Sequence, residues 1–119
     1  MLVDDEEMLL ATGRRILEHL DYEVEAFIDA PTAFNAFEAD PGRWDAVLTD
    51  LSMPAMTGLD FARRILEVAP GMPVILISGY LGPMDVEEYR KRGFRDVLQK
   101  PLAVGDLGQA LARVFHLET

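Results

Sequence analysis

The sequence predicts one α/β domain, a three-layer α/β/α sandwich in which helices cover both faces of a five-stranded parallel sheet. Short apolar runs alternate with segments in which apolar residues recur every three or four positions, five of each along the chain. That alternation favours right-handed crossovers and a parallel sheet. With 119 residues, half of them apolar, the chain can bury one core, so we expect residues 1–119 to form a single domain.

The first half of the chain contains three predicted strands and two predicted helices. Residues 1–3 form a strand that is short for the middle of a sheet, which indicates a truncated first strand in a piece of a longer protein. An acidic segment and a helical stripe predict a helix over residues 9–20, ending at a left-handed Asp21. The other predictions here are a strand at 24–27, a helix that starts at Asp29-Ala30-Pro31 and runs to residue 39, a break at Pro41-Gly42 and a strand at 45–50.

The second half of the chain completes the alternation. A helical stripe over residues 58–69 ends at Pro70-Gly71. Residues 73–78 are apolar and rich in β-branched side chains, which is typical of a strand covered on both faces. A loop at 79–83, a charged helix at 85–92 capped by Gly93, a strand at 96–99 and a last helix at 107–115 follow.

The composition excludes several classes of function. A formal charge of -10, from 21 acidic and 11 basic residues, disfavours a nucleic-acid surface, because phosphate binding needs clustered Lys and Arg. The absence of cysteine excludes disulfides and thiolate metal sites. No apolar run reaches membrane-spanning length, and the first residues do not read as a signal peptide. We therefore expect a soluble, cytoplasmic protein that binds neither nucleic acid nor membranes.

Polar side chains stand at the ends of four predicted strands. They are Asp4 and Asp5 after the first strand, Asp50 at the end of the third, Ser78 at the end of the fourth and Lys100 after the fifth. The carboxyl ends of parallel strands share one edge of the sheet, where α/β proteins keep their sites. Carboxylates ~4 Å apart repel by about 4 kcal/mol per pair at an effective dielectric of 20. A hard cation such as Mg²⁺ offsets that repulsion, so a Mg²⁺ site is predicted here.

Asp50 is the predicted nucleophile of this site. A carboxylate beside a metal and a lysine can attack phosphorus and become an aspartyl-phosphate. Mg²⁺ and Lys100 would stabilise the equatorial oxygens, and the Ser78 hydroxyl would donate to the attached phosphoryl group. No histidine accompanies Asp50 as a base, because His19 falls within the first predicted helix and His116 lies near the end of the last one.

These residues resemble, over nearly the whole chain, the receiver domains of two-component response regulators and hybrid histidine kinases, with hybrid-kinase receivers the most similar. The resemblance implies a flavodoxin-like sheet of strand order 2-1-3-4-5, a phosphorylation site at Asp50, and a signalling domain rather than an enzyme. Self-catalysed phosphoryl uptake and loss belong to such a domain, and any histidine kinase activity would lie in another part of the parent protein. The resemblance rests on Asp4-Asp5, Asp50, Met53-Pro54, Gly58, Ser78 and Lys100-Pro101.

The resemblance also implies ligands, partners and a switch. Asp5, Asp50 and the Ser52 carbonyl would hold Mg²⁺ directly, with Asp4 assisting through water. The expected partner is a histidine kinase or a phosphotransfer domain, and the last helices allow a homodimer. On phosphorylation Ser78 would move together with the loop and helix after strand four. The peptide bond before Pro101 is expected to be cis.

Three positions modulate this expectation. The position three residues before the lysine, where many receivers carry a switching Tyr or Phe, is Val97, so no rotating aromatic reports phosphorylation there. Signalling would run instead through Tyr80, Tyr89 or loop position alone. Ser52 and Tyr80 follow Asp50 and Ser78 by two residues, and in the resembling family these positions flank the path of the hydrolytic water and tune the lifetime of the phosphate.

Two other functions remain open at this point. An aspartate-nucleophile phosphatase of the haloacid dehalogenase type also uses Mg²⁺ and a lysine, but it needs a second Asp two residues after the nucleophile, where Ser52 stands. A domain of receiver shape can also serve only for docking, since fold alone does not give function. Each site residue taken singly fits an ordinary helix start, turn or strand end, but four such coincidences would have to meet at one sheet edge.

Overall fold

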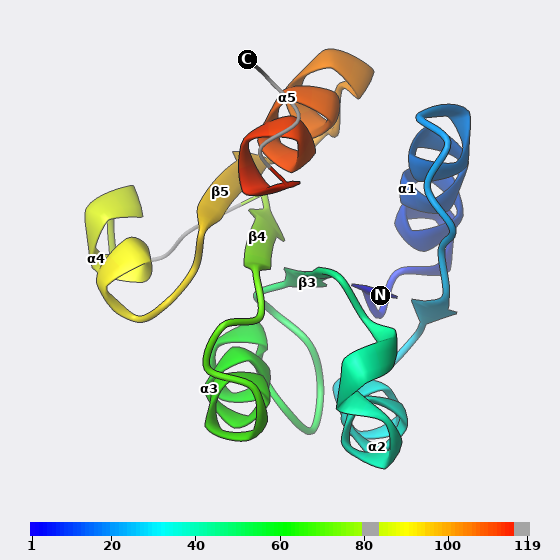
Figure 1. The fold of residues 1–119 in the computed structure, drawn as a ribbon. Helices are drawn as coiled ribbons and strands as arrows, with labels where there is room; N and C mark the ends of the chain where they lie inside the picture. Colours follow the sequence, from blue (N-terminus) through cyan, green and yellow to red (C-terminus); the bar gives the residue numbers. More distant parts are fainter. Residues whose placement is uncertain (80–83, 116–119) are drawn as a thin grey trace.

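A computed structural model describes residues 1–79 and 84–115 and confirms the predicted three-layer fold (Figure 1). The sheet has the order β2-β1-β3-β4-β5, and all its strands are parallel. The strands are β1 (Leu2–Val3), β2 (Ala26–Phe27), β3 (Val47–Asp50), β4 (Val74–Ser78) and β5 (Asp96–Gln99). The helices are α1 (Glu7–His19), α2 (Ala30–Ala39), α3 (Gly58–Val68), α4 (Val86–Lys91) and α5 (Val104–Phe115).

Two strands begin two residues later than the sequence pattern predicts. β2 begins at Ala26 rather than at residue 24, and β3 begins at Val47 rather than at residue 45. Both run beside β1, which pairs through Leu2 and Val3 alone. The predicted break at Pro41-Gly42 is also more ordered than expected, because Pro41–Arg43 forms one 3₁₀ turn, η1.

Helices flank the sheet on both faces, as Figure 1 shows. α1 and α5 cover one face, where Leu17, Leu107 and Leu111 pack on Leu48. α2 and α3 cover the other face, where the buried residues include Phe37, Phe61, Ile65, Val47 and Val74. Neighbouring residues of β3 thus point to opposite faces, as the two-residue period of a strand requires. Because helices cover both faces, only the edges of the sheet and the ends of its strands remain accessible for a functional site.

Side-chain caps mark where helices begin, and left-handed residues mark where they end, as the sequence indicated. Asp29 accepts a hydrogen bond from the Thr32 N–H (2.7 Å), which caps α2 and lowers the pKa of Asp29. Asp85 caps α4 in the same way through the Glu88 N–H (2.9 Å). Asp21 after α1 and Gly93 after α4 have φ of 69° and 108°. These ends agree with the predicted boundaries.

The amino group of Met1 is buried beside the sheet and is expected to make stability depend on pH. It donates to the Ala46 carbonyl (3.1 Å), and burial, only partly offset by Glu25 and Asp45, lowers its pKa from 8.0 to about 6. The unfolded chain therefore holds this proton more tightly, so the free energy of unfolding rises between pH 6 and pH 8. The expected gain is about 2 kcal/mol, measured by urea unfolding.

The N-acetylated chain is the control for this gain, because it carries no titrating amine but keeps all other groups. Equal pH dependence of the free and acetylated chains between pH 6 and pH 8 would contradict the assignment to Met1.

None of the helices within residues 1–79 and 84–115 combines the length and the apolar character that crossing a membrane requires.

Candidate functional site

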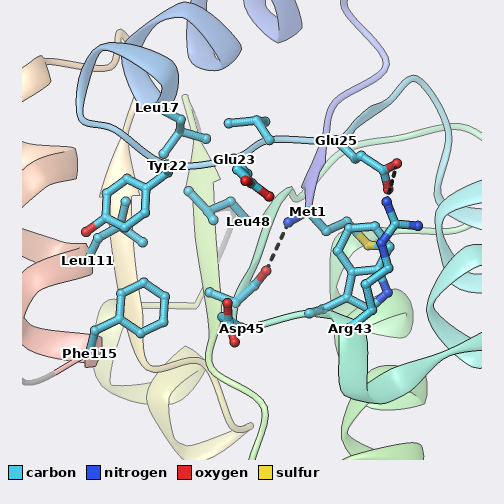
Figure 2. Close-up of a pocket in the computed structure, with 13 residues that line it drawn as sticks. Met1, Leu17, Tyr22, Glu23, Glu25, Arg43, Asp45, Leu48, Leu111 and Phe115 are labelled. Atoms are coloured by element: carbon cyan, nitrogen blue, oxygen red, sulfur yellow. Dashed lines mark hydrogen bonds and ion pairs between the residues drawn. The ribbon is translucent and has the colours of Figure 1, made fainter.

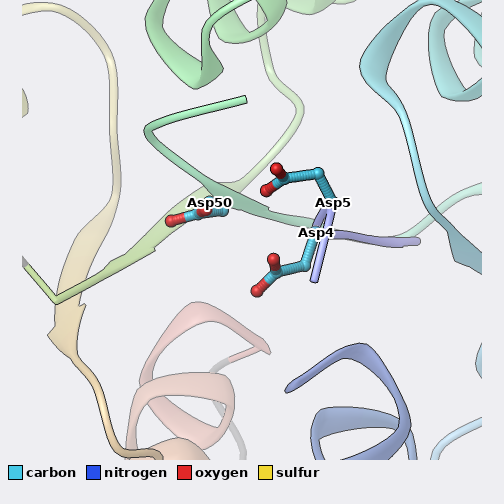
Figure 3. A group of neighbouring side chains, drawn as sticks. All are labelled: Asp4, Asp5 and Asp50. Carbon is cyan, nitrogen blue, oxygen red and sulfur yellow. The ribbon is translucent and has the colours of Figure 1, made fainter. Parts of the chain in front are cut away.

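Three aspartates gather at the carboxyl edge of the sheet (Figure 3). Asp4 and Asp5 follow β1, and Asp50 is the last residue of β3. Because β1 pairs with β3 in parallel, Val3 lies opposite Thr49 and brings both strand ends together. One carboxylate oxygen from each of the three residues lies within 4.8 Å of the other two. Asp4 and Asp50 are buried and Asp5 is half-buried, so the cluster is partly withdrawn from water.

Lys100 reaches the cluster from the end of β5. Its Nζ lies 2.9 Å from Asp4 Oδ2 and 3.4 Å from Asp50 Oδ1. Its backbone N–H donates to the Ser78 carbonyl (3.1 Å), and the bond to Pro101 is cis, as expected from the resemblance. The ammonium is thus held between two carboxylates and closer to Asp4.

The charges at this site are balanced unevenly. Burial raises the pKa of Asp50, and the negative charge of Asp4 raises it further, against the opposing effect of Lys100. Burial by itself lowers the pKa of Lys100, but its hydrogen bond to Asp4 and the charges of Asp4 and Asp50 outweigh burial, so the pKa of Lys100 is raised. One ammonium does not neutralise three carboxylates. The surplus is negative charge on hard oxygen ligands, which is what Mg²⁺ binds.

Removing the charge of Asp50 is expected to stabilise the metal-free protein. The folded state raises the pKa of this carboxyl, so ionisation at neutral pH opposes folding. We expect Asp50→Asn to raise the free energy of unfolding by about 1 kcal/mol at pH 7 in the presence of a chelator. Urea unfolding beside Asp60→Asn, which changes an exposed carboxylate of α3, is the matched measurement. A less stable Asp50→Asn variant would contradict this account.

Ser78 lies on the strand next to Asp50. β4 pairs with β3 so that Asp50 is opposite Ile77, which places Ser78 one residue beyond the end of β3, and its side chain is buried. Val97 of β5 lies opposite Leu76 of β4 and is half-buried against the α2–α3 layer. Ser52 is exposed, and its carbonyl as a metal ligand stays a prediction. Tyr80 and His116 lie outside the described residues.

The loop from Asp50 to Gly58 is closed by a backbone contact. The Gly58 N–H donates to the Leu51 carbonyl (2.8 Å), and a Cβ at Gly58 would lie 2.0 Å from the Asp50 carbonyl oxygen. Pro54 is exposed, and the next residue, Ala55, has a left-handed φ of 69°. Thr57 then caps α3 by accepting from the Asp60 N–H (3.2 Å). Only a residue without Cβ fits where α3 begins against the Asp50 backbone.

Sequence reasoning missed two features near this site. The left-handed Ala55 carries no sequence signal, because alanine rarely adopts that conformation. A cavity of about 70 Å³ lies beside Asp4, Asp50 and Lys100, against α1. Gly13, a member of the apolar stripe of α1, and the exposed Thr12 line it, but helical spacing gives no signal for a cavity.

A protein-family model and several known sequences match nearly the whole chain. The family model described as response regulator receiver domain matches residues 1–112. The aerobic respiration control sensor protein ArcB of Escherichia coli K12 is 35% identical over 120 residues, which cover 99% of this chain and 15% of ArcB. The chain accordingly spans about 15% of the length of the first curated relatives that it matches.

Two solved structures resemble the fold over nearly its whole length. A response regulator receiver domain protein from Clostridium thermocellum has a TM-score of 0.91 at 28% identity, with 98% of this chain and 92% of that chain covered. The receiver domain of a sensor histidine kinase from Pseudomonas aeruginosa has a TM-score of 0.84 at 27% identity, with 97% and 94% covered. That kinase receiver holds a magnesium ion in its active site cleft.

Proposed function

This chain belongs to the response regulator receiver domain family of two-component systems, and on that premise we propose that it takes up a phosphoryl group on Asp50 with Mg²⁺. The observation that carries the proposal is the cluster of three carboxylates at one sheet edge, with the Lys100 ammonium within 3.4 Å of two of them. A buried surplus of negative charge costs stability, so its presence favours a cationic ligand, and that cation together with Lys100 would offer positive charge to an anionic substrate. Fold alone would not support this function.

In the proposed reaction an oxygen of the Asp50 carboxylate attacks the phosphorus of the donor. The new P–O bond forms as the bond from phosphorus to the leaving group breaks, and the leaving group keeps that electron pair. Lys100 then donates to a phosphoryl oxygen and exchanges part of its contact with Asp4 for the transferred group. Asp5, Asp50 and the Ser52 carbonyl, with Asp4 through water, would hold Mg²⁺, which supplies positive charge to the phosphoryl oxygens when bound.

The proposed switch connects Ser78 with α4. Ser78 ends β4, and its hydroxyl would donate a hydrogen bond to an oxygen of the phosphoryl group carried by Asp50 on the neighbouring strand. α4 has six residues and is anchored by Tyr89, which is 1% exposed and lies edge-on to Phe94. A short helix with one buried anchor can change its position at low cost. Val97 is not aromatic, so it cannot report phosphorylation by rotating, and movement of α4 is the proposed output instead. A role of Tyr80 in this signal stays a prediction.

The proposed partners follow from the family. A histidine kinase or phosphotransfer domain would supply the phosphoryl group, and the similarity to ArcB supports a place behind a sensor kinase in a longer protein. The charge of -10 supports the expectation that this domain does not bind nucleic acid. A cytoplasmic location and homodimerisation through the last helices remain predictions.

The test is incubation with acetyl phosphate and Mg²⁺ followed by intact-mass measurement under acidic conditions. We expect one labile phosphoryl adduct that disappears with a chelator and in Asp50→Asn. Asp60→Asn, which changes an exposed carboxylate, is the control and is expected to form the adduct as the unchanged chain does. Repeated turnover without an adduct would favour the phosphatase, and a folded, Mg²⁺-binding chain with neither adduct nor turnover would favour the docking domain.

A further inference from the structure

The hydrogen-bond ladder between β1 and β3 is regular at its amino end but stops before the Asp50 carbonyl. The Met1 amine donates to the Ala46 carbonyl (3.1 Å, Figure 2), and the Leu48 N–H donates to the Met1 carbonyl (2.9 Å). Continued in the same register, the ladder would pair the Asp50 carbonyl with the Asp5 N–H. No such backbone hydrogen bond is found within residues 1–79 and 84–115. The ladder therefore ends before it reaches the site.

The Asp50 carbonyl bonds instead to the hydroxyl of Thr49, the residue directly before it. Thr49 Oγ1 donates to this carbonyl oxygen at 2.9 Å. Thr49 is 0% exposed and lies opposite Val3 and Leu76, which belong to the apolar layer beneath α2 and α3. Valine has nearly the same shape and would avoid the desolvation of a hydroxyl, so packing by itself does not require threonine here.

The same carbonyl also lies against the start of α3. A Cβ at Gly58 would come within 2.0 Å of the Asp50 carbonyl oxygen and 3.0 Å of the Leu51 Cα. The Gly58 N–H donates to the Leu51 carbonyl (2.8 Å), so the peptides that follow Asp50 and Leu51 are both held in place. The next carbonyl along the chain is that of Ser52, the proposed metal ligand. Its direction therefore depends on how the two preceding peptides are held.

We propose that Thr49 is a positioning residue, whose hydroxyl holds the Asp50 carbonyl away from the β1–β3 ladder and so sets the direction in which the chain leaves β3. The inference rests on the proposed function, because this direction places the Asp50 carboxylate and the Ser52 carbonyl relative to Mg²⁺ and the phosphoryl group. Thr49 would act through the Asp50 backbone and not by contact with the metal. Loss of such a partner of a metal ligand commonly weakens metal binding by about tenfold or more.

The test compares two variants of this residue. Thr49→Val keeps the branched shape but removes the hydroxyl, and we expect it to bind Mg²⁺ about tenfold more weakly than the unchanged chain. Thr49→Ser keeps the hydroxyl but loses a methyl group, so it should unfold at a lower temperature and still bind Mg²⁺ within about twofold of the unchanged chain. Calorimetric titration with Mg²⁺ and thermal unfolding with a chelator measure the two quantities. Lost stability in general would not produce this pattern.

A second readout uses the metal-free chain and needs no phosphorylation. The NMR chemical shifts of the carbonyl carbons of Asp50 and Ser52 report how these two peptides are held. Both should change in Thr49→Val, whereas in Thr49→Ser both should stay close to those of the unchanged chain.

Unchanged Mg²⁺ affinity in Thr49→Val would overturn the proposal, because the hydroxyl would then have no influence on the metal ligands. Equal losses of affinity in Thr49→Val and Thr49→Ser would also overturn it, since the methyl group would then be the cause. A chain that forms no adduct and binds no Mg²⁺ would contradict the proposed function instead. In that case the shift of the Ser52 carbonyl carbon still decides whether Thr49 positions this loop.

Discussion

Lys100→Met is expected to slow phosphoryl uptake from acetyl phosphate by at least about a hundredfold at saturating Mg²⁺. The ammonium lies 2.9 Å from Asp4 and 3.4 Å from Asp50, which is where negative charge on a transferred phosphoryl group would have to be stabilised. Methionine keeps an unbranched side chain of similar length but cannot donate a hydrogen bond or carry charge. Time-resolved intact-mass measurement of the adduct gives the rate.

Lys91→Met is the matched control, because Lys91 is the other lysine of the chain and is exposed at the end of α4. It removes the same charge without touching the carboxylates. Circular dichroism with added Mg²⁺ shows whether Lys100→Met is folded under the conditions of the assay. A folded, Mg²⁺-bound Lys100→Met that takes up phosphate at the unchanged rate would exclude the proposed role of Lys100.

Gly58→Ala is expected to destabilise the domain by about 3 kcal/mol and to lower the melting temperature by roughly 10 °C. The new Cβ would lie 2.0 Å from the Asp50 carbonyl oxygen and 2.9 Å from its carbon, and both are backbone atoms that cannot turn away. The loop and the start of α3 would have to shift, and the Gly58 hydrogen bond to Leu51 with them. Thermal unfolding followed by circular dichroism measures the loss.

The comparison for this variant is Gly105→Ala in the first turn of α5, where a new Cβ meets no atom within 4 Å. There alanine should stabilise by up to about 1 kcal/mol, because it restricts the unfolded chain and favours the helix. A loss of stability for Gly58→Ala together with a gain for Gly105→Ala would show that the steric contact, and not the replacement of glycine as such, decides the result. Equal melting temperatures for Gly58→Ala and the unchanged protein would mean that the loop tolerates the displacement.

Much of the candidate site could be predicted because it depends on a simple rule of parallel sheets. Asp4, Asp50 and Ser78 each end or follow a strand, and the carboxyl ends of parallel strands meet at one edge. Other contacts gave no local signal. Asp96 at the start of β5 binds Arg113 of α5 (2.7 Å) and Arg90 of α4 (3.5 Å), a link between three elements that no spacing in the sequence indicates.

The order of strands and helices was determined by the sequence itself, because alternating apolar periods, caps such as Asp29 and breakers such as Pro70-Gly71 act over a few residues. Tertiary structure alone decided which oxygen Lys100 approaches, how closely Gly58 meets Asp50 and where β2 and β3 begin. These features depend on atoms far apart in the chain. Strand length is also of this kind, because the bounds of β2 depend on its pairing with β1 and those of β3 on its pairing with β1 and β4.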